Sequence, residues 1–188
     1  MRRWLPLLLV LPLLLVLPSL GRLFEESPEP VPPAEAAPPQ QRQVDWVERF
    51  PEAGSGLVFE VRAIAVTSDG WSADVGLRNE TGVDWELDAT ARTFGVMLFP
   101  NDDVEQLERR SEDGSLPGIR AATAYRPEPP AVLEAGGRWS GSISAPGSLA
   151  AGRWLRVSFG TLTALGEPPE GLPAQLSWIT DHAYRLGC

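Results

Sequence analysis

"LVFEVRAIAVTSDGWSADVGLRN" (residues 57–79) is the stretch that decides the fold. Its apolar residues recur at every second position, which is the period of a β-strand with one buried face. Asp69-Gly70 lies in the middle and is a strong signal for a hairpin turn. The expected inward side chains are Leu57, Phe59, Val61, Ala63 and Ala65 before the turn, and Trp71, Ala73, Val75 and Leu77 after it. The stretch therefore predicts an antiparallel hairpin.

The rest of the chain repeats this pattern in short pieces. Strands are expected at residues 83–87, 93–99, 118–127, 137–145, 153–162 and 175–186, separated by turns rich in proline and glycine. One helix interrupts them, with Asp102 as the expected N-cap, Glu105 as its capping-box partner and Gly114 as the stop. We therefore predict an all-β domain over residues 51–188, an antiparallel immunoglobulin-like β-sandwich with one short surface helix.

A leucine-rich run opens the chain. Residues 4–20 are 17 positions without a charge behind Arg2 and Arg3, and positive charges before such a run direct its C-terminal side out of the cytoplasm. A membrane-spanning helix needs about 17–25 apolar residues, whereas a cleaved signal needs about 7–15 with small residues behind them. We predict an N-terminal apolar helix over residues 1–24 that anchors the chain in the cell membrane in a single pass. Cleavage near Gly21, which gives a secreted protein, stays open as the alternative.

Residues 25–50 are expected to lie outside the folded domain. Residues 25–43, "EESPEPVPPAEAAPPQQRQ", contain six prolines and a single valine, so they predict a disordered, extended stalk of about 3.1 Å per residue. Residues 44–50, "VDWVERF", are expected to form one or two helical turns. A stalk is useful only if its base is fixed, which favours the anchor over the cleaved signal.

Charge restricts the possible partners. The chain has 16 basic and 25 acidic residues and a net charge of −9, which leaves no basic face for nucleic acid. Every basic residue is arginine. Together with abundant alanine, glycine and proline, this indicates the codon bias of a GC-rich bacterial genome rather than selection for anion-binding guanidinium groups.

Two segments resemble a known family. "VGLRNETGVDWELD" (residues 75–88) and "VLEAGGRWSGSISAPGSLAAGRWLRVSFG" (residues 132–160) are similar to the telokin-like, immunoglobulin-like domains of unknown function on bacterial extracytoplasmic proteins. In those domains a strand ends in N-x-T/S-G, and an L-x-x-G-x-x-W/F-x-G hairpin and a closing strand follow. The resemblance covers Val58 to Gly160. It implies a sandwich used for binding or assembly, with no shared active site.

Few residues can support catalysis. The chain has one histidine, His182, and one cysteine, Cys188. Asp181 and His182 are neighbours in an expected strand and point to opposite faces, so they cannot form the orienting pair of a serine triad. Cys188 ends the chain, where a fixed geometry is hard to hold. Residues 101–103, "NDD", begin like a calcium loop but lack the glycine at its sixth position. No catalytic residue, metal or cofactor is predicted, and a hydrolase with a carboxylate pair is the least favoured alternative.

The predicted binding residues are Trp154 and Arg156. The alternate positions Leu155 and Val157 point inward in the strand at residues 153–162, which leaves Trp154 and Arg156 on its outer face. An outward tryptophan beside an arginine suits a peptide or a sugar, and a tryptophan that covers the sandwich edge is the alternative. We expect a non-catalytic binding or scaffolding module of the bacterial cell envelope, with an envelope protein favoured over cell-wall glycan as its partner.

Overall fold

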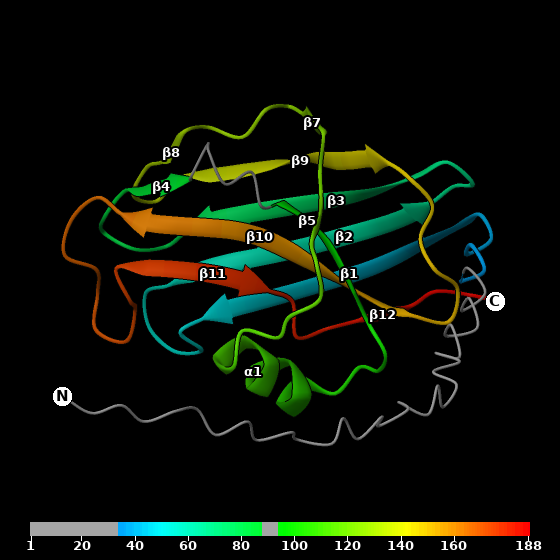
Figure 1. Cartoon of the computed structure of the whole chain (residues 1–188). Helices are drawn as coiled ribbons and strands as arrows, with labels where there is room; N and C mark the ends of the chain where they lie inside the picture. The colour runs from blue at the N-terminus through cyan, green and yellow to red at the C-terminus, as the bar shows by residue number, and fades with distance from the viewer. Residues whose placement is uncertain (1–33, 88–93) are drawn as a thin grey trace, which may run out of the picture. The chain divides into compact units, whose positions relative to one another are not determined.

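Two antiparallel sheets form the fold, and the core lies between them (Figure 1). The computed structural model describes residues 34–87 and 94–188. The five-stranded sheet has the order β1-β2-β3-β9-β7, made of β1 (Gln40–Phe50), β2 (Leu57–Val66), β3 (Gly70–Asn79), β9 (Arg138–Pro146) and β7 (Ala124–Arg126). The prediction of an antiparallel all-β fold is confirmed.

The second sheet is centred on the long strand β10 (Trp154–Ala164). β10 pairs with β4 (Trp85–Leu87), β5 (Phe94–Phe99), β11 (Gln175–Ile179) and β12 (Tyr184–Arg185). Two short strands extend this sheet, β6 (Arg120–Ala121) beside β5 and β8 (Val132–Leu133) beside β4. β10 therefore connects every part of the second sheet.

The hairpin at residues 57–79 forms as β2 and β3, with one change in its inward face. Trp71, Ala73, Val75 and Leu77 are buried, as expected. On β2 the register shifts between Val61 and Ala63. Such a bulge adds a residue to one strand and inverts the alternation beyond it. The buried side chains after the bulge are therefore Ile64 and Val66, and the expectation that Ala63 and Ala65 point into the core is wrong.

The domain begins earlier than the sequence indicated. Residues 40–50 form β1, which pairs with β2 along its length, so the expected helical turns at residues 44–50 and the expected stalk over residues 40–50 are both wrong. Ahead of β1, Ala37 is buried and Ala36 forms a bridge with Ala150. Pairing with β2 supplies backbone hydrogen bonds to a segment too polar to fold alone, and an edge strand tolerates such polarity.

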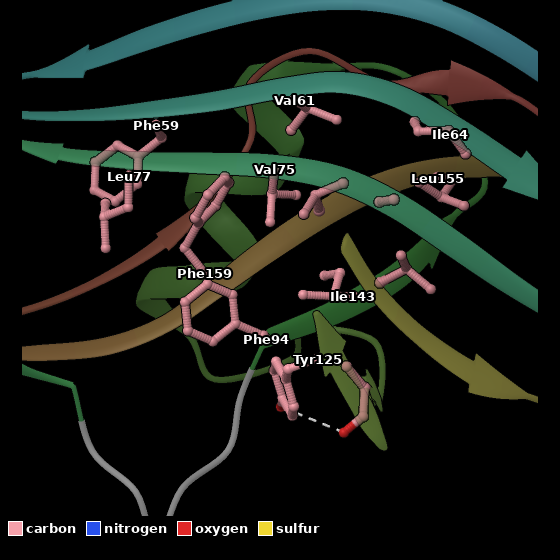
Figure 2. Close-up of a cluster of buried hydrophobic side chains, with 14 of the residues drawn as sticks. Phe59, Val61, Ile64, Val75, Leu77, Phe94, Tyr125, Ile143, Leu155 and Phe159 are labelled. Atoms are coloured by element: carbon pink, nitrogen blue, oxygen red, sulfur yellow. Dashed lines mark hydrogen bonds between the residues drawn. The ribbon is translucent and has the colours of Figure 1, made fainter. Parts of the chain in front are cut away.

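The core joins the two sheets through aromatic and branched side chains (Figure 2). The Phe59 ring of β2 meets the Phe159 ring of β10 edge-on, with the centroids 5.2 Å apart. Phe94 of β5 lies 5.5 Å from the Trp139 ring of β9. Each contact crosses from one sheet to the other, so these rings fix the sheets face to face.

The single helix of the described residues is α1 (Val104–Glu112). Its N-cap is Asp103, whose carboxylate accepts a hydrogen bond from the Gln106 amide at 3.1 Å. The expected cap at Asp102 is therefore one residue too early. Gly114 follows the helix with a φ of 71°, a left-handed conformation that glycine adopts without strain. Leu107 is the buried residue of the helix and fixes it to the sheet.

The expected membrane helix over residues 1–24, and the first part of the expected stalk, lie outside the described residues. Within the described residues, none of the helical structure has the length and apolar character that crossing a membrane requires.

Candidate functional site

Arg156, one of the two predicted binding residues, is fully buried. The expected alternation holds, since Leu155 and Val157 face the core between the sheets. However, the other face of β10 is covered at Arg156 and Ser158, which are buried, and the segments before α1 and after β11 contact Arg156 there. Strand periodicity gives the face on which a side chain lies, but not whether that face is covered. The expectation that Arg156 is exposed is wrong.

Arg156 holds three chain segments together. Its guanidinium donates to the backbone carbonyls of Thr180 and Asp102, both at 2.8 Å, and also to the carbonyl of Asp181. The Phe99 ring lies 5.4 Å from the guanidinium carbon. Burial lowers the pKa of this guanidinium, although Asp181 and Glu48 oppose the shift. Arg156 therefore joins β10 to the segment before α1 and to the segment after β11.

Trp154, the other predicted binding residue, is half-buried. It packs against a small cluster of Met97, Phe99 and Leu107, which α1 closes from outside. The indole therefore contributes to the attachment of α1 to the second sheet. Together with the burial of Arg156, this overturns the expected exposed platform of a tryptophan beside an arginine.

A buried carboxylate that the sequence analysis missed lies at the open side between the two sheets. Glu48 of edge strand β1 is 8% exposed. One carboxylate oxygen accepts from the Trp178 indole N–H at 2.8 Å, and the other accepts from the backbone N–H of His182 at 2.9 Å. The second oxygen also lies 2.8 Å from Nδ1 of the His182 ring. We call this arrangement the Glu48 clamp, because it joins the edge strand of one sheet to β11 and to the residues that follow β11.

A cleft opens beside the Glu48 clamp. It has a volume of about 510 Å³, within the roughly 300–1,000 Å³ usual for ligand sites. The residues that line it come from three elements distant in sequence: the end of β1 with the turn that follows, one side of α1, and β11 with the residues after it. Figure 1 shows α1 next to the ends of β1 and β11. Its apolar lining is Phe50, Pro51, Leu107, Trp178 and Ile179. The cleft therefore depends on tertiary packing.

The charged lining of the cleft is predominantly acidic. Glu52, Glu108 and Asp181 contribute carboxylates, and Arg49 contributes the guanidinium. Arg49 is already paired with Glu80 and donates to the Gly54 carbonyl. Burial raises the pKa of the Asp181 carboxyl, and the nearby carboxylates of Glu48 and Glu108 raise it further, against the opposing effects of Arg156 and His182. A carboxyl with a raised pKa in a cleft is a common feature of functional sites.

The clamp has one element of a hydrolytic site. A carboxylate that holds Nδ1 of a histidine is the orienting half of a catalytic triad. Among the described residues, no hydroxyl or thiol side chain is hydrogen-bonded to the His182 ring, which stacks on Trp46 at 5.6 Å. Cys188 is an exposed free cysteine. In the part of the chain that the structure describes, no group of three or more His, Cys, Asp or Glu residues is arranged to hold a metal ion.

A second, shallower hollow lies on the five-stranded sheet. Its charged lining residues are Arg62, Arg126 and Asp74, with serines of β9 between them. Arg62 already donates to the Val75 carbonyl at 3.0 Å. Its lining mixes opposite charges and offers little apolar surface besides Pro127, which makes this hollow a weaker candidate than the cleft.

The chain matches no protein-family model, no curated protein and no solved structure. The site is therefore argued from its own geometry. Only one signal in the sequence could have indicated it: Trp46, Glu48 and Phe50 alternate as strand residues do, with an acid at an inward position. An acid at such a position requires a buried partner, and a single sequence does not say which residue that is.

Proposed function

We propose that the chain is an exported, non-catalytic binding module of the bacterial cell envelope that holds a segment of a partner protein in the cleft. The observation on which this rests is the cleft itself, since its aromatic and aliphatic floor lies beside polar groups from three elements. Such convergence is typical of binding sites. The proposal includes the immunoglobulin-like classification of the two-sheet fold, which the segments at residues 75–88 and 132–160 support.

The direction of β1 supports a tethered arrangement. The described chain enters the domain just before Gln40, and the cleft begins at the other end of β1, at Arg49. Nine residues of strand separate these ends by about 30 Å at roughly 3.3 Å per residue. If residues 1–24 anchor the chain in the membrane, a tether attached before β1 leaves the cleft at the far end of that strand, accessible to a partner.

A protein segment is favoured over a glycan because the aromatic rings of the cleft contact one another. The Trp178 ring stacks on Phe59 with centroids 4.9 Å apart and an interplanar angle of 8°, and Phe50 lies 5.6 Å away. Sugar platforms use a flat, open ring face, whereas the Trp178 ring contacts both Phe59 and Phe50. The side chains of a peptide can pack against the exposed edges of these rings and against the apolar floor of the cleft.

Site-specific photocrosslinking in the producing cells tests the binding proposal. A photoreactive residue at Ser111, which lines the cleft from α1, is expected to give discrete adducts with a protein. The matched control is Glu112, the next residue of the same helix, which is exposed and does not line the cleft. Equal adducts from both positions, or none from Ser111, contradict the proposal.

Alkaline extraction of membranes tests the anchor separately. The full-length protein is expected in the washed membrane fraction with Met1 or Arg2 as its first residue. A soluble form that begins at Arg22 contradicts the anchor and leaves the cleft proposal intact.

A further inference from the structure

Within residues 34–87 and 94–188, the carboxylates of the cleft have no partners of their own. Glu52, Glu108 and Asp181 come from the turn after β1, from α1 and from the segment after β11. Among the described residues, none of their side chains forms an ion pair, and none of their carboxylates accepts a hydrogen bond from another side chain. Arg49, the cation of the lining, is neutralised by Glu80. The cleft therefore has uncompensated negative charge above an apolar floor.

The surroundings of Asp181 confirm the sign of this field. Burial and the charges of Glu48 and Glu108 make ionisation of Asp181 harder, and the neighbouring Arg156 and His182 oppose this only in part. Among the described residues, the guanidinium of Arg156 donates to backbone carbonyls and not to the Asp181 carboxylate. A cation in the cleft would relieve this repulsion, because an opposite charge within about 4–6 Å favours the ionised carboxylate.

We propose that the cleft recognises a basic side chain, arginine or lysine, on the segment of the partner protein. Glu108 and Asp181 accept hydrogen bonds from its cationic group, and Phe50 and Trp178 contact its aliphatic stem. This inference rests on the proposed function and names the chemistry of the segment. An arginine or lysine side chain fits because it combines an apolar stem with a charged end, which matches an apolar floor beside carboxylates from two separate elements.

Selection from a random peptide library tests this inference. The full-length protein in detergent is immobilised, and retained peptides are sequenced in parallel for four proteins. These are the wild type, Ser111→Trp, which fills the cleft from α1, the double variant Glu108→Gln/Asp181→Asn, and Glu112→Gln. The last is the control for charge on α1, because it removes one negative charge from the same helix outside the cleft.

The wild type and Glu112→Gln are expected to retain peptides enriched in arginine or lysine beside apolar residues. Ser111→Trp loses these peptides, and the double variant loses the basic preference while it keeps the apolar one. For one enriched peptide, replacing arginine by the neutral isostere citrulline is expected to weaken binding about tenfold, as the loss of a charge-assisted hydrogen bond at a partly exposed site implies. Raising the salt concentration weakens the arginine peptide more than the citrulline peptide.

Two failures are distinguishable. If the wild type retains peptides that Ser111→Trp does not, but these peptides are not enriched in arginine or lysine, the cationic inference is overturned and the proposed function stands. Peptides that Ser111→Trp retains as well as the wild type, or no retained peptide at all, overturn both. An equal loss of basic preference in Glu112→Gln shows that the net charge of the surface, and not the cleft, attracts the peptides, and this also overturns the inference.

Discussion

Glu48 is the residue whose replacement tests the structure most directly. Its buried carboxylate accepts from the Trp178 indole, from the backbone N–H of His182 and from the His182 ring. Glu48→Ala removes all three bonds and leaves space at the junction of the two sheets. A donor left without its acceptor costs about 1–3 kcal/mol in unfolding free energy, and the two N–H donors together with the space left behind amount to about 3–5 kcal/mol. We expect a loss in this range.

Two milder variants separate the contributions of the individual hydrogen bonds to this loss of stability. Glu48→Gln keeps an oxygen that can accept from His182, but its amide N–H group faces the indole N–H of Trp178, so we expect a loss of about 1–2 kcal/mol. His182→Ala keeps both N–H donors of the clamp and removes the contact of the ring with Glu48 and its stack on Trp46, and this histidine side chain is 54% exposed. Because solvent screens such a contact, we expect less than about 1 kcal/mol for this variant.

Urea unfolding of the full-length protein, followed by tryptophan emission, measures the series, since every variant keeps all seven tryptophans. In thermal unfolding, a loss of 3–5 kcal/mol corresponds to a decrease in Tm of roughly 6–20 °C for a domain of this size. Glu128→Ala is the control, because Glu128 is exposed, and we expect a change within about 0.5 kcal/mol. A loss below 1 kcal/mol for Glu48→Ala, or an equal loss for His182→Ala, refutes the clamp as described.

Three further predictions concern stability and the domain boundary. Arg156→Ala is expected to destabilise the protein by about 3–5 kcal/mol, because it leaves three carbonyls without their donor, and a loss below 1 kcal/mol in urea unfolding contradicts this. Asp181→Asn is expected to raise Tm at pH 7 and to have little effect near pH 3. Because folding raises the pKa of Asp181, the ionised carboxylate opposes folding, and this unfavourable contribution grows as the pH rises above the pKa of the unfolded chain and is absent well below it. An equal gain in Tm at both pH values contradicts the electrostatic cause. A chain that starts at Ala34 should unfold cooperatively. One that starts at Pro51 lacks β1 and should be insoluble, or unfolded by circular dichroism; a folded protein that starts at Pro51 shows that β1 is dispensable.

The elements that local chemistry specifies could be predicted well. β3 has its expected inward face, and β5 is the nearly continuous apolar run expected of a strand covered on both sides. The turn at Asp69-Gly70 joins β2 to β3, with the Thr67 amide bonded to the Gly70 carbonyl at 2.8 Å. The helix α1 lies where its cap and its glycine indicated, one residue late at the N-terminus. Each of these features depends on residues within a few positions of one another.

The candidate site could not be predicted in the same way. β1 is polar and becomes a strand only because β2 offers it a partner, so composition alone indicated a stalk. The bulge near Val61 changes the inward face without a proline or glycine to mark it. The Glu48 clamp beside the cleft brings together residues more than one hundred positions apart, as in the bond between Glu48 and Trp178. No periodicity contains that information.

Local backbone geometry and side-chain spacing are enough to indicate most of the strands, the turn between β2 and β3 and, to within one residue, the cap of the helix. Only the tertiary structure decided which alternating faces meet water. Arg156 and Glu48 show the difference: each has the spacing of an ordinary strand residue, and each is buried because distant segments pack over it. Burial of a charged group is stable only when its hydrogen bonds are satisfied by those same distant segments. The chemistry of the site therefore arises from packing between elements.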